Sequence, residues 1–292
     1  MSRLGPTLVP AATLAVLILA VLSGCATRIP PGMELDTPKA AWTAFRQHYC
    51  ARPEGDGLRV RASLYYSRTK PTKRTNRTLI SLWGDFGGPM RLDVSASIGT
   101  LLAHIREDRS GLLVFYPEDN RAYAHKNPVL GATRLGMPFP FSLDTLAHAL
   151  AGDFSGLAPR RYAEASVEGG NYVYTFSRGQ AERIVLDRLG RPVRLEGRTV
   201  RSVEDAGRWV FTLDRYEDAG PDQIALPDKL TLAMDNGERG VLHIKSREPM
   251  LAPWPAASLA LELPGDVVPI RLDNGYADGQ TGELPVIRED KQ

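Results

Sequence analysis

The sequence predicts a mainly β (α+β) protein in which about eleven antiparallel strands form one strongly curved sheet and short helices cover its apolar side. Runs such as LRVRASLYY (58–66) and NYVYTFSR (171–178) alternate apolar and polar residues with a period of two. Turn-forming clusters such as GDFGGP (84–89) and PEDN (117–120) separate these runs at the spacing of consecutive hairpins. Only two stretches, 37–50 and 143–150, have apolar residues at helical spacing, so few helices are expected.

The N-terminus predicts an export signal over residues 1–24. It has one early positive charge at Arg3, an apolar run over 14–22 and then small residues. The apolar run is shorter than the roughly 20 residues that a membrane-spanning helix needs. LSGC (22–25) resembles the lipobox of bacterial lipoproteins, which implies cleavage before Cys25 and acylation of that cysteine. Acyl chains would then tether the protein to a bilayer without spanning it.

Residues 25–36 contain two prolines and a glycine and are predicted to be a lipidated tether. The next segment, 37–50, is predicted to be a helix because Thr37 is a good N-cap and Pro38 suits the first turn. With Cys25 acylated, Cys50 has no intramolecular disulfide partner. We expect Cys50 to be a buried, small apolar residue; a catalytic thiol is the weaker alternative.

Two sets of strands follow, separated by a second helix. Ser142 is predicted to cap a helix from Leu143 to about Leu150, with Gly152 just beyond its end. The first set lies in 58–66, 77–86, 89–95, 100–107, 111–117 and 121–125, and the second in 171–178, 181–187, 191–198, 208–216, 228–235 and 240–246. Residues 37–247 form the body, and residues 248–292 are predicted to be a Pro/Gly-rich strap with a polar tail.

Composition argues against nucleic acid as a partner. The 292 residues are 43% hydrophobic and 24% charged, and 36 basic residues against 34 acidic ones give a net charge of +2. Removal of the signal takes away Arg3 and leaves 35 minus 34, or +1. The basic run RTKPTKRTNR (68–77) contains no aromatic residue, so it is interpreted as a solvated hairpin loop.

The chain has no recognisable catalytic set. None of its five histidines has a second ligand at metal spacing, and neither G-x-S-x-G nor H-E-x-x-H occurs. No phosphate-cradling glycine loop precedes a helix. We therefore expect no enzyme activity, no catalytic residue, no metal and no cofactor. A strongly curved sheet with only short helices encloses either a packed core or an apolar hollow.

Ile98 raises a separate question, because SASIG (95–99) has the composition of a turn between two strands. One interpretation is that Ile98 folds back onto the core. The other is that it stands at an exposed turn tip, where an apolar side chain would meet a membrane or a partner.

The body resembles LolB, the outer-membrane receptor for lipoproteins. The segments that carry this resemblance lie in order along 37–247. They are AWTAFRQHY (41–49), RVRASLYY (59–66), a strand with Trp83, MRLDVSASIGTLLAHI (90–105), GMPFPFSLDTLAHALAGDF (136–154) and KLTLAMDNGERGVLHIK (229–245). Two parts depart from the family pattern: the basic loop 68–77 is longer, and 248–292 has no counterpart.

The resemblance implies an antiparallel half-barrel whose helices lid an apolar cavity for acyl chains. It implies a monomer at the periplasmic face of the outer membrane that accepts triacylated lipoproteins from a LolA-like carrier and inserts them into the inner leaflet, without chemistry. Ile98 and Gly99 fall on the family's membrane-insertion loop. Candidate cavity residues are Leu64, Leu82, Trp83, Leu92, Val94, Leu101, Ile105, Val114, Tyr174 and Phe176, and candidate lid residues are Trp42, Phe45, Phe139, Phe141 and Leu146. The alternative is a structural or interaction lipoprotein of the envelope, or a binder of another amphiphile, with the same fold.

Overall fold

The computed structural model describes residues 29–69, 72–137, 139–200, 206–217, 220 and 223–273. The signal segment 1–24, Cys25 and the tail after residue 273 lie outside these ranges. The described chain contains the helices α2 (Pro38–His48), α3 (Pro128–Arg134), α4 (Leu143–Leu150) and α5 (Ala256–Leu259). Its strands are β1 (Gly57–Arg68), β2 (Arg74–Asp85), β3 (Met90–Ala96), β4 (Leu101–Asp108), β5 (Gly111–Tyr116), β6 (Arg121–His125), β7 (Glu164–Glu168), β8 (Asn171–Thr175), β9 (Ala181–Leu186), β10 (Pro192–Val200), β11 (Ala206–Tyr216), β12 (Pro227–Met234), β13 (Arg239–Met250) and β14 (Ile270–Arg271).

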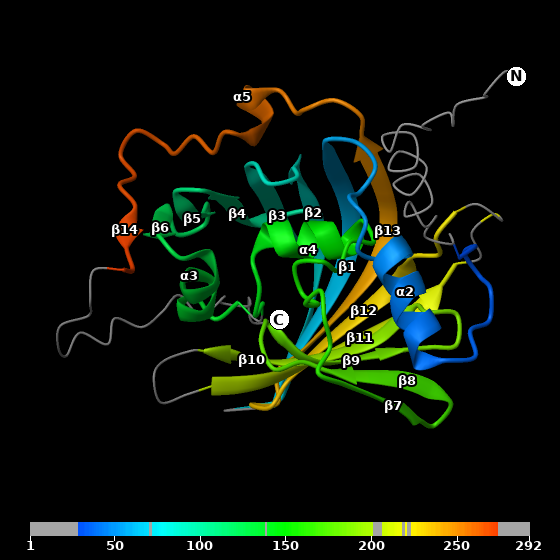
Figure 1. Ribbon diagram of the computed structural model, residues 1–292. Coiled ribbons are helices and arrows are strands. Elements are labelled where there is room, and N and C mark those ends of the chain that lie inside the picture. The colour runs from blue at the N-terminus through cyan, green and yellow to red at the C-terminus, as the bar shows by residue number, and fades with distance from the viewer. Residues whose placement is uncertain are drawn as a thin grey trace, which may run out of the picture.

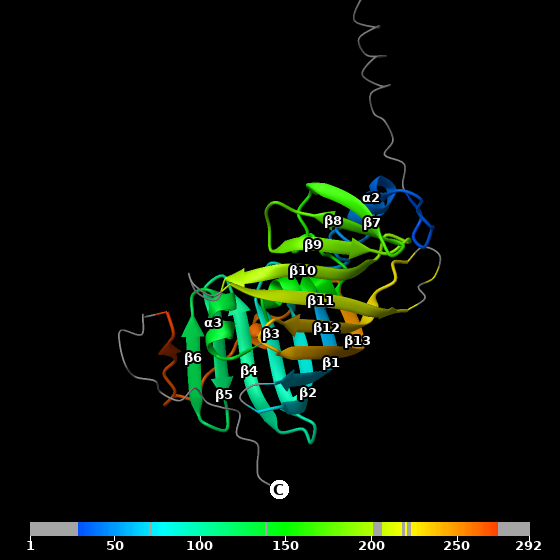
Figure 2. The same ribbon diagram turned by 90° about the horizontal axis from the view of Figure 1, so that it is seen from below.

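All of these strands belong to one curved sheet, which confirms the predicted fold class. The order is β14-β6-β5-β4-β3-β2-β1-β13-β12-β11-β10-β9-β8-β7, so two meanders join where β1 pairs with β13 (Figures 1 and 2). The described part of the chain has fourteen strands, against a prediction of about eleven. The difference lies partly in β7 and β14: every β7 residue is exposed, and β14 has two residues, so neither shows an alternating pattern.

The helices α2 and α4 begin where their caps predict. The Ala40 amide donates to Thr37 Oγ1 over 3.2 Å, and the Thr145 amide donates to Ser142 Oγ over 3.1 Å. Helix α3 was not predicted; its cap is Asn127, whose side chain accepts from the Leu130 amide. The three helices lie against one face of the sheet, the concave inner face (Figure 1).

Strand register assigns side chains to the two faces of the sheet, because residues directly opposite in an antiparallel ladder share a face. One row on the inner face runs through Val60, Leu82, Leu92, Ile105 and Val114, all of them buried.

The adjacent row places Trp83 opposite Arg91 and Arg59, and therefore on the outer face. Leu101 is half-buried and has the parity of the buried Ala103 and Ile105 along β4, but a register shift between β3 and β4 separates it from them. Trp83 was predicted to line the cavity, and this assignment is wrong. The alternation has a period of two, so neighbouring residues such as Leu82 and Trp83 necessarily face opposite ways.

The segment after β13 lies as a strap on the outer face. Trp83 Nε1 donates to the Ser258 carbonyl over 3.1 Å, and Arg106 Nε donates to the Leu259 carbonyl over 2.9 Å. The Trp254 amide donates to Asp85 Oδ1 over 2.9 Å. The strap ends in β14, which pairs in parallel with the edge strand β6 (Figure 1). Outer-face polar side chains thus provide the hydrogen bonds that hold a segment with little regular structure.

Candidate functional site

The interior beneath α2 is filled by aromatic rings. The Trp42 ring lies 4.9 Å from that of Tyr174 and 5.8 Å from that of Phe176, between ring centroids. Phe45 and Tyr162 each lie 5.3 Å from Trp42. Such offset and edge contacts stabilise a packed cluster. This end of the interior is therefore solid core, and four of the predicted cavity and lid residues (Trp42, Phe45, Tyr174 and Phe176) lie in it.

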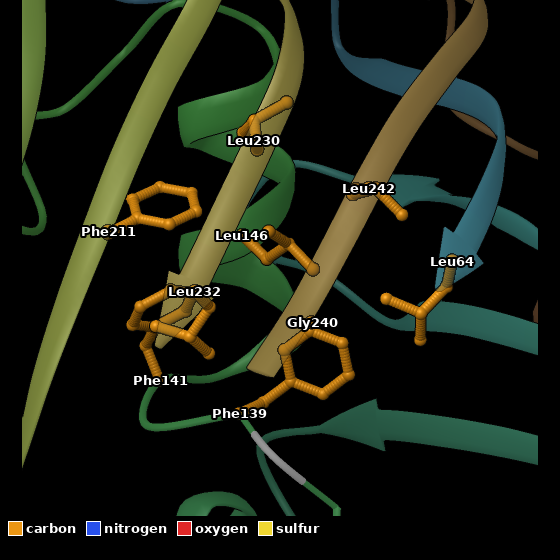
Figure 3. A pocket seen from close by; sticks show the side chains of 9 residues that line it. All are labelled: Leu64, Phe139, Phe141, Leu146, Phe211, Leu230, Leu232, Gly240 and Leu242. Carbon is orange, nitrogen blue, oxygen red and sulfur yellow. The ribbon is translucent and has the colours of Figure 1, made fainter. Parts of the chain in front are cut away.

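An apolar hollow lies next to this core, under α4 and the segment before it. It is a cavity of about 20 Å³, which is room for one water molecule. Figure 3 shows its side chains converging from β1, β11, β12 and β13 on one side and from α4 and the preceding segment on the other. The lining residues are Leu64, Phe139, Phe141, Leu146, Phe211, Leu230, Leu232, Gly240 and Leu242.

Phe139, Phe141 and Leu146 close this hollow from the helical side. Phe141 is buried, and its ring makes edge contacts with Trp209 at 6.0 Å and with Phe211 at 5.6 Å between centroids. These three side chains fill most of the space on the helical side, since the cavity that remains has a volume of about 20 Å³.

A buried carboxylate fixes the N-terminus of α4 to the sheet. Glu107 on β4 is 6% exposed and accepts hydrogen bonds from the amides of Leu143 at 2.8 Å and Asp144 at 3.3 Å. Burial raises the pKa of Glu107 above its ordinary value, while the two amide hydrogen bonds act in the opposite direction. The Asp144 carboxylate in turn accepts from the Gly87 amide over 2.9 Å. The helix that closes the hollow is thus held by backbone donors at its first turn.

The C-terminal end of α4 is held by a second polar contact. His148 Nδ1 lies 3.0 Å from Asp153 Oδ2, and its ring lies 4.7 Å from that of Phe86. The hydrogen bond to Asp153 raises the pKa of His148, although burial lowers it. Both ends of α4 are therefore attached through side chains of neighbouring loops and strands.

Ile98 lies at the tip of the β3–β4 turn with its side chain in solvent. It is 90% exposed, and the turn is closed by the Gly99 amide donating to the Ala96 carbonyl over 2.9 Å. Gly99 has a φ of +92°, a conformation that glycine adopts without strain. The interpretation in which Ile98 folds back onto the core is therefore wrong, and the exposed-tip interpretation remains.

The structure brings together four of the predicted site residues: Leu64, Phe139, Phe141 and Leu146 line the hollow. Leu82, Leu92, Ile105 and Val114 face the same interior farther along β2–β5, and Val94 is half-buried against that core. The sequence reasoning missed Phe211, Leu230, Leu232, Gly240 and Leu242. The alternation in RWVFTLDRY (208–216) and DKLTLAMD (228–235) marks three of these as inner-face residues, but only the pairing of β13 with β1 puts them beside Leu64.

Other site chemistry is sparse in the described part of the chain. Burial raises the pKa of the half-buried Cys50 thiol to about 12, so at neutral pH it is protonated and a poor nucleophile. No group of histidine, cysteine, aspartate and glutamate side chains suited to a metal ion occurs within the described residues. Among the same residues, no helix combines the length and the apolar character needed to cross a bilayer.

Comparison with solved structures places the fold. The chain is similar to a LolA superfamily protein from Nitrosomonas europaea, with a TM-score of 0.50, 11% identity, and 78% of this chain and 99% of that chain covered. It is also similar to a DUF1329 family protein from Desulfovibrio piger, with a TM-score of 0.46, 10% identity, and 77% and 98% covered. No protein-family model matches the sequence, and no curated protein matches it. The fold is LolA-like.

Proposed function

We propose that this chain binds the acyl chains of lipoproteins in the interior of its curved sheet, accepts them from a LolA-like periplasmic carrier and passes them to the outer membrane. The transfer involves no covalent chemistry. Cargo moves because acyl chains, which are costly to expose to water, find apolar burial first in the carrier, then here and finally in the bilayer. Acylation of Cys25 would keep the protein at the periplasmic face of that membrane.

The observation that carries the proposal is the hollow lined by leucine and phenylalanine side chains between the sheet and α4 (Figure 3). Its walls come from the sheet, whereas its closure comes from Phe139, Phe141 and Leu146 on a short helix and the segment before it. Apolar surface on both sides favours a hydrocarbon ligand over a polar one. The LolA-like fold is consistent with this arrangement.

Binding requires the closing side chains to move, because about 20 Å³ does not hold a hydrocarbon chain. Each methylene that enters contributes about 0.8 kcal/mol, which offsets the displacement of Phe139 and Phe141 from their present contacts. The empty protein is then stable with its own rings in the site, and the loaded protein exchanges them for the ligand. Because the ligand must displace the protein's own rings, its affinity for the site stays moderate. A protein that passes its cargo on needs an affinity low enough for release.

The test is saturable binding of a fluorescent acyl-chain probe to the lipid-free chain. We expect fluorescence enhancement that saturates at one probe per chain and that unlabelled long-chain amphiphiles reverse. A probe signal that rises linearly with no saturation would contradict the proposal. The transfer step is tested by measuring delivery of a triacylated lipoprotein from its carrier into outer-membrane vesicles.

Ile98 provides a specific test of delivery. We expect Ile98→Glu to fold normally, because the side chain is 90% exposed, and to lose delivery while it still binds the probe. The control is Val167→Glu on β7, where the valine is also apolar and exposed but lies in an edge strand far along the sheet order from β3 and β4. Unchanged delivery by the folded Ile98→Glu variant would remove the turn from the mechanism.

A second candidate function is supported by the packing itself. The aromatic cluster around Trp42 and the nearly filled hollow are also what a solid structural lipoprotein would have. In that case the strap over residues 251–273, which lies on the outer face of the sheet, would be the surface that contacts an envelope partner. Saturable binding of the acyl-chain probe distinguishes the two functions, because a solid core has no binding site for the probe.

A further inference from the structure

A second hollow lies beside the apolar one, and it differs in chemistry. It has a volume of about 90 Å³, compared with about 20 Å³ for the apolar hollow, and so has room for several water molecules. Phe139 lines both hollows, so its ring stands between them. Figure 3 shows Phe139 at the edge of the apolar cluster, next to Gly240. The second hollow is lined by Thr133, Gly136, Met137, Phe139, Pro140, Thr199, Met234, Asn236 and Glu238.

Thr199 provides an unused hydrogen-bonding group in this hollow. The residue is 5% exposed, and its buried Oγ1 has no hydrogen-bond partner among the residues that the structure describes. A buried hydroxyl without a partner is unfavourable, and such groups in folded proteins are ordinarily paired with protein, water or ligand. Thr199 lies on β10 and lines the hollow together with Met234. Its Oγ1 has almost no accessible surface, so a ligand hydroxyl or amide would bond to it after the Thr199 side chain turns toward the hollow, and would then gain a bond that the described protein does not make.

The charge of the lining limits which ligand fits. Glu238 is the ionisable residue among the described side chains that line the hollow, and no lysine or arginine is among them. Burial raises the pKa of the neighbouring Tyr66 to about 12, and the Glu238 carboxylate, which accepts a hydrogen bond from that hydroxyl, adds to the rise. A carboxylate or phosphate head placed here would meet the like charge of Glu238, with no cation among the described lining residues to offset it. The hollow therefore favours an uncharged head that donates hydrogen bonds.

We propose that this second hollow binds the uncharged, hydrogen-bonding head of an amphiphile whose acyl chain enters the apolar hollow past Phe139. Thr199 Oγ1 and the Asn236 and Glu238 side chains would hold a hydroxyl or amide group, such as the glyceryl ester end of an acylated molecule. The proposal rests on the proposed function, and it adds a preference for the head group that acyl-chain burial alone does not provide.

The experiment is displacement of a bound fluorescent acyl-chain probe from the full chain at pH 8 by two amphiphiles of equal chain length, monopalmitoyl glycerol and palmitate. We expect monopalmitoyl glycerol to displace the probe at a concentration at least about 10-fold lower. Thr199→Val removes the hydroxyl at nearly constant shape. This substitution is expected to raise the concentration of monopalmitoyl glycerol needed to displace the probe by about 3- to 10-fold. The concentration of palmitate needed should not change.

Thr231→Val is the matched control. Thr231 on β12 is 7% exposed, and its buried Oγ1 likewise has no hydrogen-bond partner within the described part of the chain. It stands between Leu230 and Leu232, which line the apolar hollow, so it faces the outer side of the sheet. The same chemical change in an equally buried threonine should leave both displacement curves unchanged.

The outcomes separate the two proposals. If the probe binds and both amphiphiles displace it equally in wild type, the second hollow holds only water and the head-group proposal is wrong, while acyl-chain binding stands. If Thr199→Val and Thr231→Val behave alike, Thr199 does not contact the head and the proposal is again wrong. If the probe does not bind at all, the proposed function itself fails.

Discussion

Phe141→Ala should weaken folding and strengthen acyl-chain binding at the same time. Phe141 is buried, makes edge contacts with the rings of Trp209 and Phe211, and lines the apolar hollow. Removing a buried phenylalanine ring costs about 3 to 5 kcal/mol of unfolding free energy. That cost includes the two aromatic contacts, each of about 0.5 to 1.5 kcal/mol.

The same substitution enlarges a cavity that now measures about 20 Å³ by the volume of the lost ring. Cavities lined by leucine and phenylalanine stay dry and accept apolar ligands. If a chain places about three methylenes in the vacated space without displacing a ring, it gains about 2 kcal/mol. We therefore expect the dissociation constant of an acyl-chain probe to fall at least about 10-fold.

The assay pairs urea unfolding with probe titration on the same samples. Phe154→Ala is the control, because Phe154 is equally buried in the core but does not line the hollow. It should lose similar stability and gain no affinity. A folded Phe141→Ala variant that binds the probe no better than Phe154→Ala would refute the location of the site.

Two further predictions concern buried titratable groups. Because the folded state raises the pKa of Glu107 above 4.5, this group's contribution to stability is complete below that pH and is lost as pH rises through the folded value. Glu107→Gln cannot ionise, so its destabilisation relative to wild type in urea unfolding should be smaller at pH 8 than at pH 4; Glu118→Gln in an exposed turn is the control. In a Cys25→Ser background, Cys50 should react with iodoacetamide at pH 8 far more slowly than in urea, because burial raises its thiol pKa to about 12. Equal rates in buffer and urea would contradict this burial.

Only part of the site was predictable from the sequence, because helix caps and helical spacing are strong local signals, whereas the face of a strand residue is not encoded locally. Ser142 and the helical period that follows it predicted α4, and the structure places Leu146 of that helix in the hollow. Trp83 was misassigned because an apolar aromatic residue in a strand reveals its burial but not which face buries it. Its ring lies instead under an arginine of the outer face, with Arg91 at 5.3 Å from the ring centroid. Alternation within one strand divides its residues into two sets, and the pairing with a neighbouring strand is needed to say which set faces the interior.

Local chemistry determined most of the strands, the helices α2 and α4 and the turn that carries Ile98, because alternation, capping and turn residues act over a few positions of the chain. Tertiary structure decided that β13 pairs with β1, and this pairing alone sets Leu242 and Gly240 beside Leu64. It also decided how little space remains under Phe139 and Phe141, since a cavity is the difference between the volume that a curved sheet encloses and the volume of the side chains that enter it. The cavity volume depends on contacts between segments that are distant in the sequence, so local sequence patterns do not predict it.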